Sequence, residues 1–487
     1  MRGIKGFIAG TLVSRVLGLV REAAIAYLLG AHDAADAFYA AMRIPMLLRD
    51  MVAENVVQTA FIPSFVEARE RFKSSESFLS AVVLLLGLAV SLLTLLGIIL
   101  APWFVKLITW GFPPEKMALT IDLTRLIFPL IILVSASAIA SGLLNTRRHF
   151  FVPALSPAFL NLGTVLLAAG AGFCFRDMTG KAVILTLGTL VGGALQLLFQ
   201  FPFLRGFRMG RPDFRHPSIK SFGKLLIPVL VSTGFSRLTL LVNTLIASFL
   251  GTGAVAYLNY AFRIMQLPLG LFGVGIATVV LPGMAERAAR NVLPDEDLSS
   301  GEAASLFFTA PAAVFIITAA QPIIQLLFGR GSFSLADSFY SAEALILYTL
   351  GVPGISLSRV YLNYMFALKK TSEPNISFLL SAATNIALCL ALAPIMGFAG
   401  LALATGISGW AQAIYLRWRT PLSPEGAGRL ILILGIAGVS YILPWIFLAR
   451  MNPWLSVSAE MVIGTGAYLG LTHLAGFGFT KRLFRRG

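Results

Sequence analysis

Residues 81–100, AVVLLLGLAVSLLTLLGIIL, contain no charged side chain. A helix rises 1.5 Å per residue, so a helix of this length spans about 30 Å, the thickness of the hydrocarbon core of a bilayer. The stretch does not alternate apolar with polar residues, as a membrane-spanning strand would. It therefore predicts a transmembrane helix.

Similar apolar runs recur from one end of the chain to the other. With 57% apolar and 12% charged residues, the chain is far from the roughly 25% charged residues of soluble domains. We expect an all-α, polytopic membrane protein with about fourteen spans, the first retained rather than cleaved as a signal because Arg15 interrupts it. The expected spans are residues 5–30, 34–65, 77–105, 118–145, 152–175, 182–204, 221–250, 254–285, 303–328, 338–368, 375–395, 398–417, 428–449 and 455–478.

The basic residues predict how the chain is oriented. If successive loops alternate between the two sides of the membrane, 24 of the 38 Lys and Arg residues fall on the side of the N-terminus. The loops of the other side hold six: Lys106, Lys116, Arg176, Lys181, Arg330 and Arg450. The positive-inside rule then places both termini in the cytoplasm. A net charge of +16 distributed in this way indicates contact with anionic lipid headgroups, and we expect no nucleic-acid partner.

The other eight cations lie within the expected spans and are all arginines: Arg15, Arg21, Arg43, Arg49, Arg125, Arg237, Arg263 and Arg359. An arginine facing lipid at the bilayer centre costs at least about 2.5–3.5 kcal/mol. Arg125 can avoid this cost by an ion pair with Asp122, one helical turn away, or by snorkelling to the membrane surface, and Arg359 by a similar arrangement. The acids expected to be buried and available as partners are fewer: Glu22, Asp50, Glu54, Asp122 and Glu343. The chain therefore predicts a positively charged interior that binds a mobile anion, and the planar guanidinium suits phosphate.

The first span shows how such a site is built. In SRVLGLVRE, residues 14–22, helical spacing places Ser14, Gly18 and Arg21 on one stripe and Arg15 and Glu22 on the next. Gly18 leaves a gap in which a ligand can approach. Arg15 and Glu22 are about 10 Å apart along the axis, so Glu22 cannot neutralise Arg15 by direct contact.

The opening motif recurs, which predicts two lobes. Ser14-Arg15 is echoed 222 residues later by Ser236-Arg237, and Thr189-x3-Gly193-x2-Gln196 by Thr405-x3-Gly409-x2-Gln412. Six spans per copy make the two copies parallel, a transporter arrangement with the site between lobes. The expected organisation is an N-lobe at 1–204, a basic cytoplasmic linker at 205–220, a C-lobe at 221–417 and two additional helices at 428–478.

Four segments carry a family resemblance: SRVLGLVRE, DAFYAAMRIPMLLRD (36–50), AFIPSF (60–65) and YAFRIMQLP (260–268). They resemble the MurJ (MviN) family of lipid II flippases in the multidrug/oligosaccharidyl-lipid/polysaccharide exporter superfamily. The resemblance implies a bacterial inner-membrane transporter, not an enzyme, that moves undecaprenyl-diphosphate-linked peptidoglycan precursor to the outer leaflet. It implies that Arg15, Arg21, Arg49 and Arg263 lie near the diphosphate, beside Ser14 and Gly18, and that Asp36 is important.

The resemblance also implies partners and a groove for the lipid tail. The last two helices, within 428–478, are expected to hold the polyprenyl chain. Lipid II, membrane lipids and peptidoglycan synthesis enzymes are the implied partners, with no cofactor or metal and a monomeric chain. The two cysteines, Cys174 and Cys389, fall in expected spans and indicate no disulfide.

The chain departs from the family at two places. Phe262 and Gln266 stand where some members carry acids around the arginine of the eighth span. Where some members place sodium-binding carboxylates, this chain has Asn243 and Cys389, which leaves Asn385 and Thr405 as neutral ion ligands. We therefore expect at most weak sodium dependence.

Other functions stay open at this point. A flippase for another polyprenyl-diphosphate sugar needs the same arginines with a different headgroup pocket. A drug or cation antiporter needs an acidic cavity, a scaffold leaves the arginines within the spans unexplained, and a membrane glycosyltransferase needs catalytic acids at the outer surface.

Overall fold

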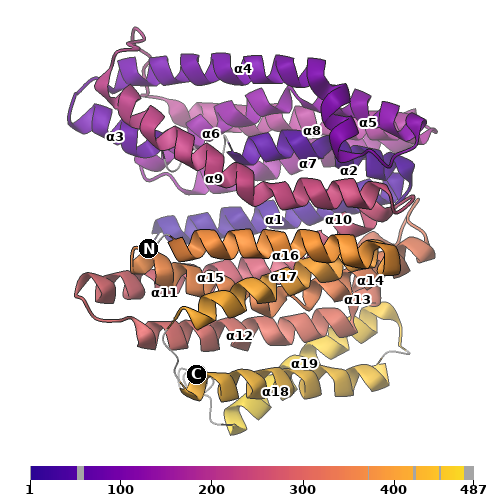
Figure 1. The fold of residues 1–487 in the computed structure, drawn as a ribbon. Coiled ribbons are helices and arrows are strands. Elements are labelled where there is room, and N and C mark those ends of the chain that lie inside the picture. Colours follow the sequence, from indigo (N-terminus) through magenta and orange to yellow (C-terminus); the bar gives the residue numbers. More distant parts are fainter. Residues whose placement is uncertain (1, 52–59, 371, 421–423, 449–450, 476–487) are drawn as a thin grey trace. The chain divides into compact units, whose positions relative to one another are not determined.

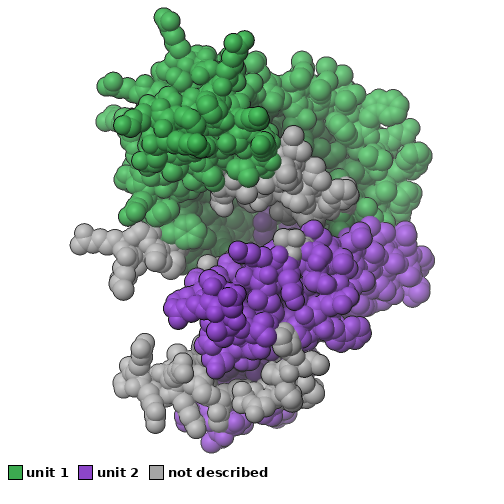
Figure 2. All heavy atoms as spheres, turned by 60° about the vertical axis from the view of Figure 1, so that its left-hand side comes forward, with its two compact units in different colours: residues 1–256, 331–333 green, residues 257–330, 334–487 purple. Residues whose placement is uncertain are grey.

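The computed structural model describes residues 2–51, 60–370, 372–420, 424–448 and 451–475. These residues form helices and connecting turns, with no strand in the described ranges. The chain divides into two compact units, residues 1–256 with 331–333 and residues 257–330 with 334–487 (Figure 2). The expected all-α class is confirmed.

Unit 1 contains the first nine α-helices (Figure 1). They are α1 (Arg2–Leu29), α2 (Asp33–Arg49), α3 (Ile62–Glu70), α4 (Ser75–Ile108), α5 (Pro114–Ile127), α6 (Leu130–Thr146), α7 (Phe151–Cys174), α8 (Met178–Gln200) and α9 (Pro217–Ser248). A short 3₁₀ helix, η2 (Phe201–Leu204), follows α8 directly. Within this unit α7 packs against both α8 and α1. The contact with α8 is close, because a Cβ on Gly192 would lie 2.1 Å from the carbonyl oxygen of Leu160.

The chain passes from unit 1 to unit 2 within α10 (Ala254–Pro268), whose first turn belongs to unit 1. Its other helices are the π-helical turn η3 (Leu269–Gly273), α11 (Val274–Ala289), α12 (Asp295–Thr318), α13 (Ala320–Phe328), α14 (Leu335–Thr349), α15 (Val352–Ala367), α16 (Ser372–Met396), α17 (Phe398–Trp418), α18 (Pro424–Leu448) and α19 (Pro453–Leu474).

Prolines explain why several expected spans appear as two helices. Pro129, Pro322 and Pro353 have no backbone N–H, so the carbonyl four residues earlier loses its helical partner. The chain breaks at these points between α5 and α6, α12 and α13, and α14 and α15. At Pro268 the helix continues instead as the π-helical turn η3.

The helix α4 has the distribution of side chains that is typical of a helix in contact with lipid. Its exposed face carries leucines, Ile99 and Trp103, which is 76% exposed, whereas its buried face includes Ser80 and Thr94. In water this pattern would be reversed. Outward apolar and inward polar side chains are the arrangement that lipid favours.

Every expected span overlaps a described helix or a broken pair of helices. Among the residues that the structure describes, eight stretches are both long and apolar enough to cross a membrane, which makes this a multi-pass membrane protein, while the total of fourteen spans stays a prediction. The eight are Ser75–Ile108, Pro114–Thr146, Phe151–Ala171, Met178–Leu204, Ala254–Ala289, Asp295–Thr318, Leu335–Ala367 and Ser372–Met396.

A contact in unit 1 and a contact at matched positions in unit 2 support the internal repeat of the sequence. In unit 1 the hydroxyls of Thr164 on α7 and Thr189 on α8 lie 3.2 Å apart. In unit 2 the Asn385 amide on α16 donates to the Thr405 hydroxyl on α17 at 3.2 Å. The two pairs stand at nearly the same offset along the chain, so the same helix contact is made twice.

The compact units and the repeat divide the chain at different points. The repeat boundary at residues 205–220 assigns α9 to the second copy, yet α9 packs on α2, α3 and α4 in unit 1. The segment before α9 is held in unit 1 as well, because the Arg147 guanidinium donates to the carbonyls of Arg205 and Gly206. The lobe boundaries therefore remain expectations.

Residues 331–333 lie with unit 1, although the chain on either side belongs to unit 2. The backbone N–H of Ser332 donates to the Tyr27 carbonyl at 2.8 Å, and its hydroxyl donates to the Leu28 carbonyl at 3.1 Å. Gly30 and Gly331 have φ values of +58° and +65°, and a Cβ on either would lie 2.3 Å from a carbonyl oxygen. Both positions therefore require glycine.

Candidate functional site

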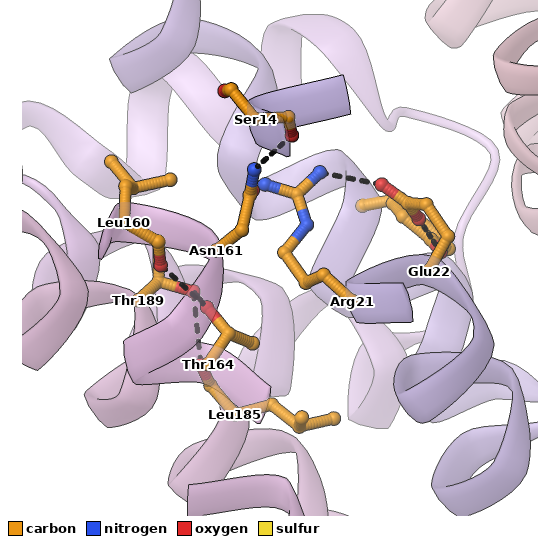
Figure 3. Close-up of polar contacts among 9 residues, drawn as sticks. Ser14, Arg21, Glu22, Leu160, Asn161, Thr164, Leu185 and Thr189 are labelled. Carbon is orange, nitrogen blue, oxygen red and sulfur yellow. Dashed lines mark hydrogen bonds and ion pairs between the residues drawn. The ribbon is translucent and has the colours of Figure 1, made fainter. Parts of the chain in front are cut away.

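Arg21 and Glu22 form a buried ion pair on α1, shown with its surroundings in Figure 3. The Arg21 Nη2 and Glu22 Oε1 atoms are 2.5 Å apart, and the two side chains are 11% and 2% exposed. The Tyr39 hydroxyl of α2 donates to Glu22 Oε2 at 2.7 Å. Glu22 therefore holds Arg21 in place, and Tyr39 holds Glu22.

Part of the Arg21 guanidinium still has hydrogen-bonding capacity. Its Nε is buried and has no hydrogen-bond partner among the described residues. A guanidinium has five N–H donors, so one carboxylate contact leaves most of them available for another acceptor.

The stripe of Ser14 and Gly18 faces α7. The Asn161 side-chain amide donates to the Ser14 carbonyl at 3.2 Å, and a Cβ on Gly18 would lie 3.5 Å from the same amide nitrogen. The gap expected at Gly18 is thus occupied by Asn161, which packs α1 against α7. Arg15 is half-buried and forms no ion pair with any residue that the structure describes.

The remaining expected anion-binding arginines are on α2 and α10. Arg49 is partly exposed and donates to Asp50 Oδ1 from both Nε and Nη2, at 3.1 and 2.8 Å. Arg263 is exposed on α10 within unit 2. Glu54, another acid expected in the second span, and the side chain of Arg237 lie outside the described residues.

Arg125 forms the ion pair that was expected, whereas the ion pair or snorkelling expected for Arg359 stays a prediction. Arg125 Nη1 lies 3.7 Å from Asp122 Oδ1 on the same helix. Arg359 donates to the Leu269 carbonyl at 3.4 Å, on the π-helical turn after α10.

Asp36 is fully buried, and protein donors surround its carboxylate. Lys116 Nζ on α5 lies 2.5 Å from Oδ2, the Gly253 N–H donates to the same oxygen at 2.7 Å, and the Ala256 N–H donates to Oδ1 at 2.8 Å. The last two groups belong to the beginning of α10, where a negative charge stabilises a helix end. Asp36 therefore fixes the first turn of the helix that carries Arg263.

Asp33 completes this cluster at its exposed edge. Its Oδ1 lies 2.9 Å from Lys116 Nζ and accepts a hydrogen bond from the Thr252 hydroxyl at 2.9 Å. Partial burial acts to raise the pKa of Asp33, but the hydrogen bond and charge of Lys116 outweigh it and hold the pKa below its ordinary value.

The expected neutral ion ligands are divided between the units. Asn385 and Thr405 bond to each other in unit 2, and the Cys389 thiol donates to Asn385 Oδ1 at 3.7 Å. Asn243 lies on α9 in unit 1. Within the described ranges, no three His, Cys, Asp or Glu side chains are grouped as a metal site would require.

Among the described residues, four buried charged side chains were not expected from the sequence, and one of them is Asp337, which is 3% exposed in the first turn of α14. Lys116 was assigned to an outer loop but is 6% exposed, Glu302 is buried and its Oε1 lies 3.2 Å from Arg417 Nε, and Glu460 is fully buried on α19. Each stands near a helix end or on a stripe of small polar residues. Lys116, Glu302 and Asp337 lie just outside the expected spans, and Glu460 lies within the last one without a basic residue nearby in the sequence.

A cavity of about 420 Å³ lies between α4 and residues 209–212 in unit 1. Its lining includes Leu84, Leu88 and Met209, and none of its lining residues is charged. It does not fit a phosphate-bearing ligand.

Comparisons with known proteins identify the family. The family model for lipid II flippase MurJ matches residues 25–468. A probable lipid II flippase MurJ of Rhizobium meliloti is 35% identical over 424 residues, covering 83% of this chain and 78% of the relative. Lipid II flippase MurJ of Burkholderia cenocepacia is 30% identical over 517 residues, covering 99% and 98%.

Solved structures agree with these relatives. A lipid II flippase MurJ in an inward closed conformation matches with a TM-score of 0.85 and 26% identity, covering 98% of this chain and 99% of that one. An inward-facing multidrug resistance MATE transporter of the MOP superfamily shares the fold, with a TM-score of 0.70 at 14% identity, covering 86% and 95%. On this evidence the chain belongs to the lipid II flippase MurJ family.

Proposed function

We propose that this protein flips lipid II, the undecaprenyl-diphosphate-linked peptidoglycan precursor, from the cytoplasmic to the outer leaflet by alternating access. The observation that carries the proposal is the arginine content of α1, combined with the family to which the chain belongs. Arg15 is half-buried without an ion pair among the described residues, and Arg21 retains a buried Nε without a partner.

The chemistry of a diphosphate fits these arginines. Its oxygens accept parallel hydrogen bonds from a guanidinium fork, and arginine stays charged when water is removed. We assign diphosphate binding to Arg15, Arg21, Arg49 and Arg263, with Ser14 and Gly18 shaping the same face of α1. Glu22 and Asp50 each lie beside one arginine and keep it oriented when the ligand is absent.

Asp36 has a different role in this proposal. Its oxygens are held by Lys116 and by the first turn of α10. Arg263 follows Ala256 by seven residues on that helix, about 10 Å along the axis. Asp36 is therefore a positioning residue for Arg263 rather than a group that touches the diphosphate.

The orientation and energy source follow from charge. Both termini lie in the cytoplasm by the positive-inside rule, and α18 and α19 provide the groove for the polyprenyl tail. Moving one elementary charge through 100 mV is worth about 2.3 kcal/mol. Because the expected sodium ligands are neutral, the membrane potential drives transport.

Complementation tests the assignment. A flippase-depleted strain receives the wild-type chain or an alanine variant of Arg15, Arg21, Arg49 or Arg263, with Arg125→Ala as the matched control because Arg125 pairs with Asp122 on its own helix. At equal membrane levels, the four variants lose function and the control keeps it. Full function from a chain carrying both Arg15→Ala and Arg21→Ala would contradict the assignment.

The accumulating lipid identifies the substrate. In depleted cells, lipid II builds up on the cytoplasmic leaflet if the proposal is correct. Accumulation of a different polyprenyl-diphosphate sugar, with lipid II unchanged, would instead favour a flippase for that sugar.

A further inference from the structure

The helix α19 is polar on its buried side and apolar on its exposed side. Its buried residues fall at every fourth position: Ser456, Glu460, Gly464, Tyr468 and Thr472. Leu455, Met461, Val462 and Ile463 are exposed, with Val462 at 72%. The only carboxyl group on this stripe, Glu460, is thus directed into unit 2 and away from the lipid-facing surface.

Glu460 packs against the break between α12 and α13. The helices in contact with α19 are α12, α13 and α18. Pro322 leaves the chain without a helical N–H for the Thr318 carbonyl, and α12 ends at Thr318. The Thr318 hydroxyl is hydrogen-bonded to Glu460 Oε1.

Within the described part of the chain, no cation balances this carboxyl group. Glu460 forms no ion pair with a residue that the structure describes, and its Oε2 is buried without a hydrogen-bond partner there. The neighbouring helices offer one titratable side chain among those described: Tyr441 of α18, with none on α13 or on the part of α12 after Glu302. Tyr441 interacts electrostatically with Glu460. The Tyr441 hydroxyl lies 2.9 Å from that of Thr465. A phenol is neutral near pH 7, so it supplies no positive charge.

The hydrogen-bond inventory favours a neutral carboxyl. The hydroxyl of Thr318 has one hydrogen but lies within hydrogen-bond distance of the Val314 carbonyl at 2.9 Å, the Phe315 carbonyl at 3.1 Å and Glu460 Oε1. A protonated Glu460 can donate to Thr318 Oγ1, which then donates to a carbonyl of its own helix. An ionised Glu460 would compete with those carbonyls for a single hydrogen and would leave a buried charge unpaired.

We propose that Glu460 is a proton-binding site that joins α19 to the α12–α13 break. With the proton bound, Glu460 donates to Thr318 and α19 packs on α12. Loss of the proton places an unpaired carboxylate between these helices and weakens their contact. The protonation state of Glu460 therefore controls how firmly α19 is attached, whatever substrate the protein moves.

Infrared spectroscopy of the full chain in lipid nanodiscs tests the site. A protonated carboxyl group has a carbonyl stretch separate from that of carboxylates. We expect such a band near neutral pH in the wild-type chain, its loss in Glu460→Gln, and its retention in Glu115→Gln, a control at an exposed glutamate. Identical wild-type and Glu460→Gln spectra in this region between pH 5 and 9, which spans about two units on each side of neutrality, would overturn the proposal.

Two further measurements test the contact with Thr318 and the effect of the proton on the stability of the folded chain. Thr318→Val removes the acceptor of the proposed hydrogen bond, so the band should persist but shift to the frequency of a carboxyl group without that bond; an unshifted band would refute the Thr318 contact. Raising the pH should shorten the half-life of the folded wild-type chain at fixed temperature, whereas Glu460→Gln, an uncharged isostere, should show no such dependence. Equal pH dependence in both chains would also count against the proposal.

Discussion

Replacing Asp36 by asparagine should destabilise the protein far more than the same change at Asp33. Asp36 Oδ1 accepts from Ala256, and Oδ2 accepts from both Gly253 and Lys116. Whichever way an asparagine amide turns, its NH₂ group faces at least one N–H donor. Lys116, whose side chain is 4% exposed, also loses its buried counter-ion.

The magnitude follows from burial. Removing one partner of a buried ion pair costs about 3–5 kcal/mol. In Asp36→Asn, Lys116 still has its ion pair with Asp33 at 2.9 Å. We therefore expect this variant to lose about 3 kcal/mol of unfolding free energy, the lower end of the range. Asp33 is 58% exposed, so Asp33→Asn should cost about 0–1 kcal/mol.

Equilibrium unfolding measures the difference. The purified chain in mixed micelles is titrated with sodium dodecyl sulfate, and the unfolding free energies of wild type, Asp36→Asn, Asp33→Asn, Lys116→Met and the Asp36→Asn/Lys116→Met double variant are compared. The double variant should lose less than the sum of the single changes, because Asp36→Asn deprives Lys116 of its buried partner and Lys116→Met deprives Asp36 of its counter-ion, and the double variant incurs neither cost. If Asp36→Asn and Asp33→Asn cost the same, the buried anchor is not what stabilises the first turn of α10.

Four further outcomes are expected. Arg→Lys at Arg15 or Arg21 should restore flipping only partly in complementation, because the charge remains and the planar fork is lost; full restoration would show that charge alone suffices. Cysteines introduced at His32 and Arg211 should react with an impermeant thiol reagent from opposite sides of the membrane, and labelling from the same side would exclude the proposed topology. Transport in proteoliposomes at fixed membrane potential should change little with sodium, and a steep rise would show that neutral ligands suffice for coupling. Because the pKa of Asp33 is held below its ordinary 3.8, its contribution to stability is present above that pH and is lost as the pH falls through the lowered value; Asp33→Asn should remove this part of the acid transition, and an unchanged transition would contradict the Lys116 contact.

The membrane fold could be predicted from the sequence because its signal is local. The run at 81–100 is long and apolar enough to specify a span without information from elsewhere. The helix breaks at Pro129 and Pro322 were harder to predict from the sequence. The residues on both sides are equally apolar, so hydropathy alone joins the two helices.

The arginines of the candidate site were visible because a guanidinium within an apolar run is unusual. Their partners were only partly predictable. Glu22 is adjacent to Arg21 in sequence, but Lys116 and Asp36 are separated by 80 residues. Assigning Lys116 to a loop was wrong, because it stands in the first turn of α5 and its ammonium group is directed inward to a carboxylate. Glu460 was missed although it lies within the last expected span, because no basic residue within a helical turn of it in the sequence indicated a buried charge.

Unit 1 takes three residues, 331–333, from far along the chain, and this affects the timing of its synthesis. When the ribosome has passed residue 256, the end of α1 and the turn at Gly30 still lack the Ser332 contacts. At about 5–20 residues per second, the missing segment follows roughly 4–15 s later. During that interval the Tyr27 and Leu28 carbonyls lack the donors that Ser332 supplies, so the C-terminal end of α1 is completed only after several later helices have been synthesised.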